Sequence, residues 1–183
     1  MVKPMKTIRE SFEEYYASVE VEKHGKKGIR IQYEYIGPKY YFGKRDSDMK
    51  AFKRISGLLT ALAVVVYFTV GLVYSPVNYQ GHAWIFAALA LIPMVFQLAG
   101  MIELLATGDY LTELNFHGVR GKLMIAPSLS ALCLFVGAAL GVEEIVKWNY
   151  PSYSIAVVAG FLIAGIIEII LSVYIGRVPF YKR

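Results

Sequence analysis

Two glutamates stand alone in apolar stretches of the sequence, and of all its residues they are the best suited to chemistry. Glu103 lies within residues 96–105 and Glu168 within residues 161–170, and five of the ten aligned positions of these stretches are identical. A carboxyl group in the hydrocarbon of a membrane costs about 2.5–3.5 kcal/mol on insertion scales. We therefore expect both side chains to face other helices rather than lipid.

The residues around each glutamate repeat at a helical spacing of i, i+3, i+4 and i+7, which puts them on one face of a helix. The first stripe is Phe96, Ala99, Gly100 and Glu103, and the second is Phe161, Ala164, Gly165 and Glu168. The small residues would let a neighbouring helix come close. Gln97, which has Leu162 as its counterpart, is a candidate polar ligand in the first copy; the alternative is that it only bonds a neighbouring backbone group.

Three uses of these glutamates compete. In the first, desolvation and proximity keep one carboxyl protonated, and the pair exchanges protons or binds a cation. In the second, each glutamate only fixes the helix register, through hydrogen bonds to hydroxyls or ion pairs with snorkelling arginines. The candidate hydroxyls are those of Thr60, Ser128 and Ser130, and the candidate arginines are Arg54 and Arg120. In the third, the glutamate faces pair between subunits or with a larger complex.

The elements that carry these residues are membrane helices. The chain has 183 residues, of which 56% are hydrophobic, and a mean hydropathy of +0.47. The apolar residues gather in four blocks, at about 55–74, 83–107, 123–146 and 153–175. Each block is long enough to cross about 30 Å of hydrocarbon as a helix. The sequence thus predicts an all-α membrane protein with four transmembrane helices arranged as two hairpins.

The two hairpins are predicted to be copies of one unit. Residues 49–111 would form the first hairpin, and residues 112–183 the second hairpin with a short tail. Because each unit crosses the membrane twice, both copies point the same way and form a parallel repeat.

The basic residues predict the orientation. Thirteen of the 19 Lys and Arg residues precede the first block, two lie in the middle loop and three in the tail, whereas the other two loops hold only Lys147. The positive-inside rule therefore places both termini in the cytoplasm. The net charge of +5 is explained by this topology, and we predict no binding to nucleic acid.

Residues 1–48 are predicted to form a cytoplasmic or interfacial segment. Residues 7–16 have the spacing of a short amphipathic helix, and residues 17–22 and 28–36 alternate as the strands of a β-hairpin would. An isolated hairpin is marginal in water. It is expected to rest on the bilayer, on the helix ends or on a partner.

Several site types are not predicted. The lone Cys133 excludes a disulfide, and His24, His82 and His117 lack metal-ligand spacing. We find no nucleophile elbow or P-loop and predict no enzymatic activity, cofactor or metal. Glu143 and Glu144, near Lys147, are interpreted as a solvated helix end.

The leading hypothesis is a transporter-like protein that handles a proton, cation or small solute at Glu103 and Glu168. The alternative is a non-catalytic accessory or assembly subunit of a larger membrane complex. The lipid bilayer is the predicted partner in both cases, with a homo-oligomer or a larger complex as the further assemblies considered.

Overall fold

The computed structural model describes residues 14–22, 29–43 and 46–182, and these are mostly helical. Four helical segments are long and apolar enough to cross a membrane, which confirms the predicted number of spans: Ser47–Gly71, Ala83–Ala106, Asn115–Trp148 and Ser154–Arg177. The amphipathic helix expected at residues 7–16 falls almost entirely outside the described residues.

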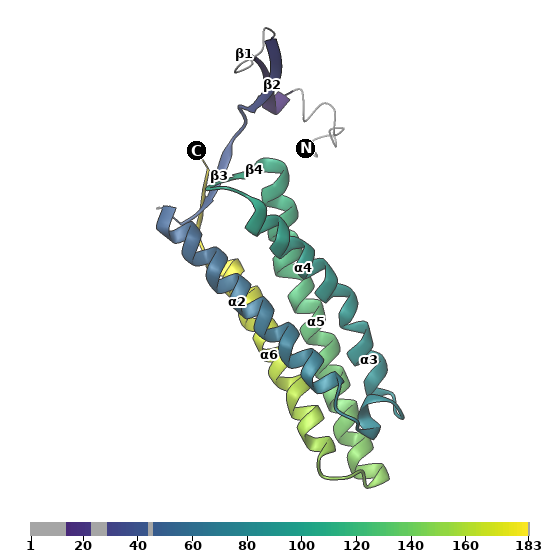
Figure 1. Cartoon of the computed structure of the whole chain (residues 1–183). Coiled ribbons are helices and arrows are strands. Elements are labelled where there is room, and N and C mark those ends of the chain that lie inside the picture. The colour runs from purple at the N-terminus through teal and green to yellow at the C-terminus, as the bar shows by residue number, and fades with distance from the viewer. Residues whose placement is uncertain (1–13, 23–28, 44–45, 183) are drawn as a thin grey trace, which may run out of the picture.

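The four spans form a bundle (Figure 1). Helix α2 (Asp46–Gly71) lies along α6 (Ser154–Arg177), and α4 (Leu91–Ala106) lies along α5 (Glu113–Trp148). The second span begins with a separate short helix, α3 (Ala83–Leu89), which follows a 3-10 turn, η1, at Pro76–Asn78. Both α2 and α5 start well before the apolar blocks predicted at residues 55 and 123, because each helix begins with a more polar segment.

A small antiparallel sheet covers one end of the bundle, here called the sheet end; the opposite end is called the loop end. Strand β3 (Lys39–Phe42) is central, with β4 (Leu111–Thr112) on one side and β5 (Phe180–Lys182) on the other. Register pairs Tyr40 with both Leu111 and Lys182. The segment that precedes the first span is therefore joined to the connection between the hairpins and to the tail.

Aromatic packing holds this sheet on the helices. The rings of Tyr40 and Phe116 stack with centroids 4.4 Å apart, and those of Phe42 and Phe52 with centroids 4.1 Å apart. The guanidinium of Arg120 lies 4.7 Å from the ring centroid of Phe180, at cation–π distance. The Arg120 side chain therefore contacts strand β5 of the sheet.

Strands β1 (Tyr16–Glu22) and β2 (Ile29–Tyr35) pair antiparallel, with Tyr16 opposite Tyr35. This hairpin stands beyond the sheet end of the bundle (Figure 1). Its base contacts the start of α5: the backbone N–H of Glu113 donates to the Tyr35 hydroxyl at 3.0 Å. A hydrogen bond with the Glu113 side chain, together with some desolvation, raises the pKa of Tyr15 to about 12, so this phenol stays protonated.

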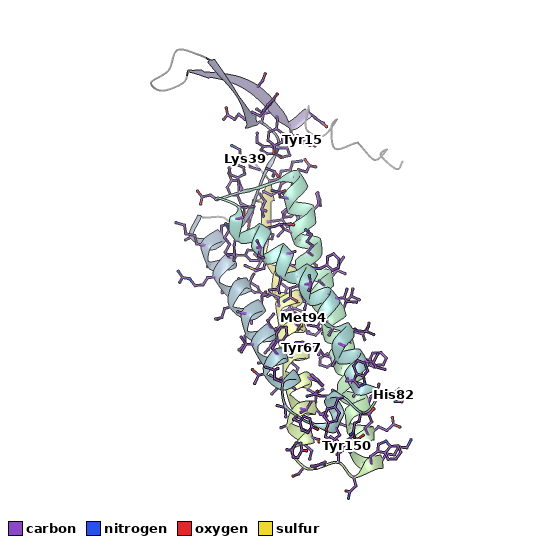
Figure 2. All side chains as sticks on the ribbon, turned by 45° about the vertical axis from the view of Figure 1, so that its right-hand side comes forward. Tyr15, Lys39, Tyr67, His82, Met94 and Tyr150 are labelled. Carbon is purple, nitrogen blue, oxygen red and sulfur yellow. The ribbon has the colours of Figure 1, made fainter. Side chains whose placement is uncertain are left out.

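The break between α3 and α4 is stabilised by hydroxyls from other helices. The Tyr67 hydroxyl of α2 donates to the carbonyl of Ala87 at 2.8 Å, and Ser130 Oγ of α5 donates to the carbonyl of Ala90 at 3.3 Å. The Ala90 carbonyl also accepts from the backbone N–H of Met94 at 3.2 Å, so Ser130 is a second donor there. Figure 2 shows Tyr67 and Met94 midway along the bundle, with Lys39 toward the sheet end and His82 toward the loop end.

At the loop end, Glu144 differs from its prediction as a solvated residue. Its side chain is buried and accepts hydrogen bonds from the backbone N–H groups of His82 and Ala83. It thereby satisfies donors at the start of α3 that have no partner within the helix. A Cβ on Gly81 would overlap the Glu144 carboxylate, so this contact requires glycine.

We expect Gly81→Ala to lower the free energy of unfolding by about 1–3 kcal/mol, because the displaced carboxylate leaves buried N–H donors unpaired. Chemical denaturation of the purified chain in detergent measures the change. Gly71→Ala is the matched control, since nothing lies within 4 Å of its Cβ position. Equal stability of the two variants would contradict the capping role of Glu144.

Candidate functional site

Four polar side chains of the spanning helices are fully buried and make no regular hydrogen bond to any described residue. Ser56 and Thr60 come from α2, Gln97 from α4 and Glu168 from α6. We call these four residues the polar centre. Ser56 and Thr60 are four residues apart and so share the face of α2 that points into the bundle.

Two aromatic contacts between α2 and α6, one on each side of Glu168 along the helix, show which residues of α2 lie at the same depth as Glu168. Phe52 contacts Tyr174 at a centroid distance of 5.9 Å, and Tyr67 contacts Phe161 at 6.5 Å. In these antiparallel helices Thr60 lies about midway between the two α2 rings, and Glu168 about midway between the two α6 rings. Thr60 and Glu168 therefore lie at the same depth.

Gln97 approaches the same position from α4. Its side chain is the polar group that interacts with the Glu168 carboxyl. The two side chains are close, yet no side-chain nitrogen or oxygen of the polar centre completes a hydrogen bond of regular geometry with any described residue.

These unmet hydrogen bonds define the chemistry of the polar centre. A buried polar atom without a partner costs about 1–3 kcal/mol, and an unpaired ionised carboxylate costs considerably more. The centre offers carboxyl, amide and hydroxyl oxygens, the ligand type of hard cations. With one carboxyl among neutral groups, it can balance a single positive charge, either a proton or a monovalent cation.

Glu103 does not join the polar centre, which corrects the prediction of a carboxylate pair. Its side chain is 46% exposed and forms an ion pair with Lys122 of α5. The predicted ionic partners Arg54 and Arg120 are not the ones that it uses. The glutamates are separated because α4 turns its Gln97 face, and not its Glu103 face, toward the bundle.

The predicted stripe is buried throughout on α6, whereas on α4 only Gly100 of the stripe is buried. Phe161, Ala164 and Gly165 are buried together with Glu168. On α4 the buried residues are Met94, Gln97, Gly100, Met101 and Leu104. Phe96 is 57% exposed, whereas its counterpart Phe161 is 1% exposed. Equivalent positions of the two stretches therefore have different surroundings.

Of the three hydroxyls predicted as partners of the glutamates, only that of Thr60 lies at the polar centre. Ser128 Oγ donates to the carbonyl of Met124 at 3.0 Å and lies 2.8 Å from Ser172 Oγ. Ser130 bonds the carbonyl of Ala90. These two serines compensate backbone carbonyls.

Ser56 was not predicted as a site residue. Its spacing from Thr60 is a signal that could have identified it, because two hydroxyls one turn apart in an apolar helix share a face. Within the described ranges, no group of three or more His, Cys, Asp or Glu side chains could hold a metal ion.

Comparison with protein-family models, with curated proteins and with solved structures gives no match for this chain.

Proposed function

We propose that this chain is a small transporter-like membrane protein in which a proton and a monovalent cation compete for Glu168. Gln97 and Thr60 would supply neutral oxygens beside the carboxyl. The Ser56 hydroxyl would lie one helical turn before Thr60, toward the sheet end. The observation that carries the proposal is the burial of these four side chains without regular hydrogen bonds to any residue that the structure describes.

The physical reason is that a bound proton or cation would interact with buried polar groups that have no regular partner among the described residues. Buried polar groups in proteins are normally hydrogen-bonded, and exceptions call for an explanation such as a functional role or an unseen ion or water. Ionisable residues within membrane spans commonly mark ion and proton pathways. One carboxyl paired with one cation leaves the centre neutral, which suits a membrane interior.

The test is cation-driven proton movement in vesicles that contain the purified full chain and an internal pH dye. We expect an imposed Na⁺ or K⁺ gradient to change the internal pH, and we expect Glu168→Gln to reduce this rate at least about tenfold, corresponding to about 1.4 kcal/mol. Thr60→Val, which removes one oxygen, should weaken the cation dependence.

Glu143→Gln is the matched control, because the Glu143 side chain is exposed at the loop end, away from the polar centre. This variant should transport at the rate of the unmodified chain. Equal rates for Glu168→Gln and the unmodified chain would overturn the proposal.

The proposal includes a topology and an origin for the two hairpins. The sheet end would lie in the cytoplasm, since 18 of the 19 Lys and Arg residues fall in segments that lead to that end. The hairpins would derive from a duplicated unit, after which only the second copy kept its glutamate in the bundle interior.

One observation favours the second candidate function, an accessory subunit. The β1–β2 hairpin stands beyond the bundle, and Tyr33 of β2 and Ile36, which follows this strand, are exposed. A partner complex could cover these side chains. This alternative predicts that the chain co-purifies with larger membrane proteins and that Ile36→Glu abolishes the association.

A further inference from the structure

An apolar groove of about 350 Å³ runs between α4 and α5 on the outer surface of the bundle. Its walls are Ile92 and Phe96 of α4 and Ile125 and Leu129 of α5, and each of these side chains is at least half exposed. In a membrane, this surface faces hydrocarbon chains. The volume lies within the range of about 300–1,000 Å³ that is usual for ligand pockets.

The groove ends in charge at the side nearer the sheet end. Lys122 lines that end and forms the ion pair with Glu103. Glu103 follows Phe96 by seven residues and so lies on the same face of α4 as that groove wall. An apolar groove with an exposed ion pair at one end matches a phospholipid, which has apolar chains and a charged headgroup.

We propose that this groove binds one phospholipid whose headgroup carries both a phosphate and a primary ammonium. One acyl chain would occupy the groove, the phosphate would contact Lys122, and the ammonium would donate hydrogen bonds to Glu103. This binding is independent of Glu168 and of the proposed transport.

Charge complementarity selects this headgroup over the other common ones. Lys122 and Glu103 together are neutral, so they match a headgroup without net charge better than an anionic one. A quaternary ammonium has no N–H and cannot donate a hydrogen bond to the Glu103 carboxylate. Phosphatidylethanolamine meets both requirements, since its headgroup has no net charge and its ammonium carries N–H donors.

Gly121 leaves space in the groove at the end where Lys122 lies. It lines the groove, and nothing lies within 4 Å of the position where its Cβ would be. Gly121→Leu would therefore start a side chain from an open Cβ position on the groove lining, where it takes up space for the lipid. Gly118→Leu is a matched control on the same helix, since its Cβ position is equally open and Gly118 lies outside the groove. Both changes replace glycine with a better helix former.

The experiment incorporates the purified full chain into bilayers with equal amounts of phosphatidylethanolamine, phosphatidylcholine and phosphatidylglycerol. Native mass spectrometry after mild detergent extraction then identifies the lipid that stays bound. We expect phosphatidylethanolamine on the unmodified chain and on Gly118→Leu, with about tenfold less on Gly121→Leu, equivalent to about 1.4 kcal/mol of binding free energy. Ile125→Trp, which narrows the groove from an exposed wall, provides the same readout if Gly121→Leu does not fold.

A second arm tests the headgroup contacts. The double variant Glu103→Gln, Lys122→Gln should retain lipid in the groove but lose the preference among the three headgroups. The proposal is overturned if Gly121→Leu and Ile125→Trp retain as much lipid as the unmodified chain, if phosphatidylglycerol or phosphatidylcholine is the preferred lipid, or if no lipid is retained.

Discussion

Glu168→Met is expected to stabilise the folded chain while abolishing cation-driven proton movement. The carboxyl oxygens of Glu168 are buried without regular hydrogen bonds among the described residues, so the native fold bears their desolvation cost. Methionine is similar in length and adapts its shape to the space available. We expect the free energy of unfolding to rise by about 1–3 kcal/mol.

Denaturant titration in detergent measures this gain, and Glu168→Gln is the comparison. Glutamine keeps a buried polar group at the same place, so its stability should stay close to that of the unmodified chain. A stability gain together with a loss of transport is the pattern of a residue retained for function at a cost to the fold. Destabilisation by Glu168→Met would instead assign Glu168 a structural role.

Phe161→Ala is expected to destabilise the bundle by about 3–5 kcal/mol, the usual cost of removing a buried phenylalanine side chain. Its ring is 1% exposed and contacts Tyr67, which in turn donates to the Ala87 carbonyl at the break between α3 and α4. The change would thus disturb packing between α2 and α6 and the support of that break.

Phe96→Ala provides the matched control, because Phe96 occupies the equivalent position of the other stretch but is 57% exposed. Its expected cost in detergent is below about 1 kcal/mol. Unfolding of the two variants in the same micelles therefore compares one residue type in two surroundings. Similar losses would show that the exposed position on α4 is covered.

The number and approximate position of the spans could be predicted from composition, because a helix that crosses hydrocarbon needs a long apolar stretch. The burial of Glu168 was also predicted correctly. The rotation of α4 was not, since nearly all its side chains are apolar and many faces are equally suited to packing. In the observed rotation Gln97 is buried, Phe96 is exposed, and Glu103 reaches Lys122.

The sheet and the role of Glu144 could not be predicted for a different reason. Strands β4 and β5 are too short for a pattern of alternation, and both pair with a strand far away in sequence. The contact of Glu144 with the N–H groups of His82 and Ala83 likewise joins residues more than 60 positions apart. Such contacts depend on the tertiary fold and leave no local signal.

The central position of β3 has a consequence for biogenesis. Residues 39–42 emerge from the ribosome early, but their neighbours in the sheet are residues 111–112 and 180–182. Pairing over such separations is slow, because the intervening chain must be ordered first. All three strands can pair only after both helical hairpins have been inserted. Formation of the sheet would therefore report that insertion of the chain is complete.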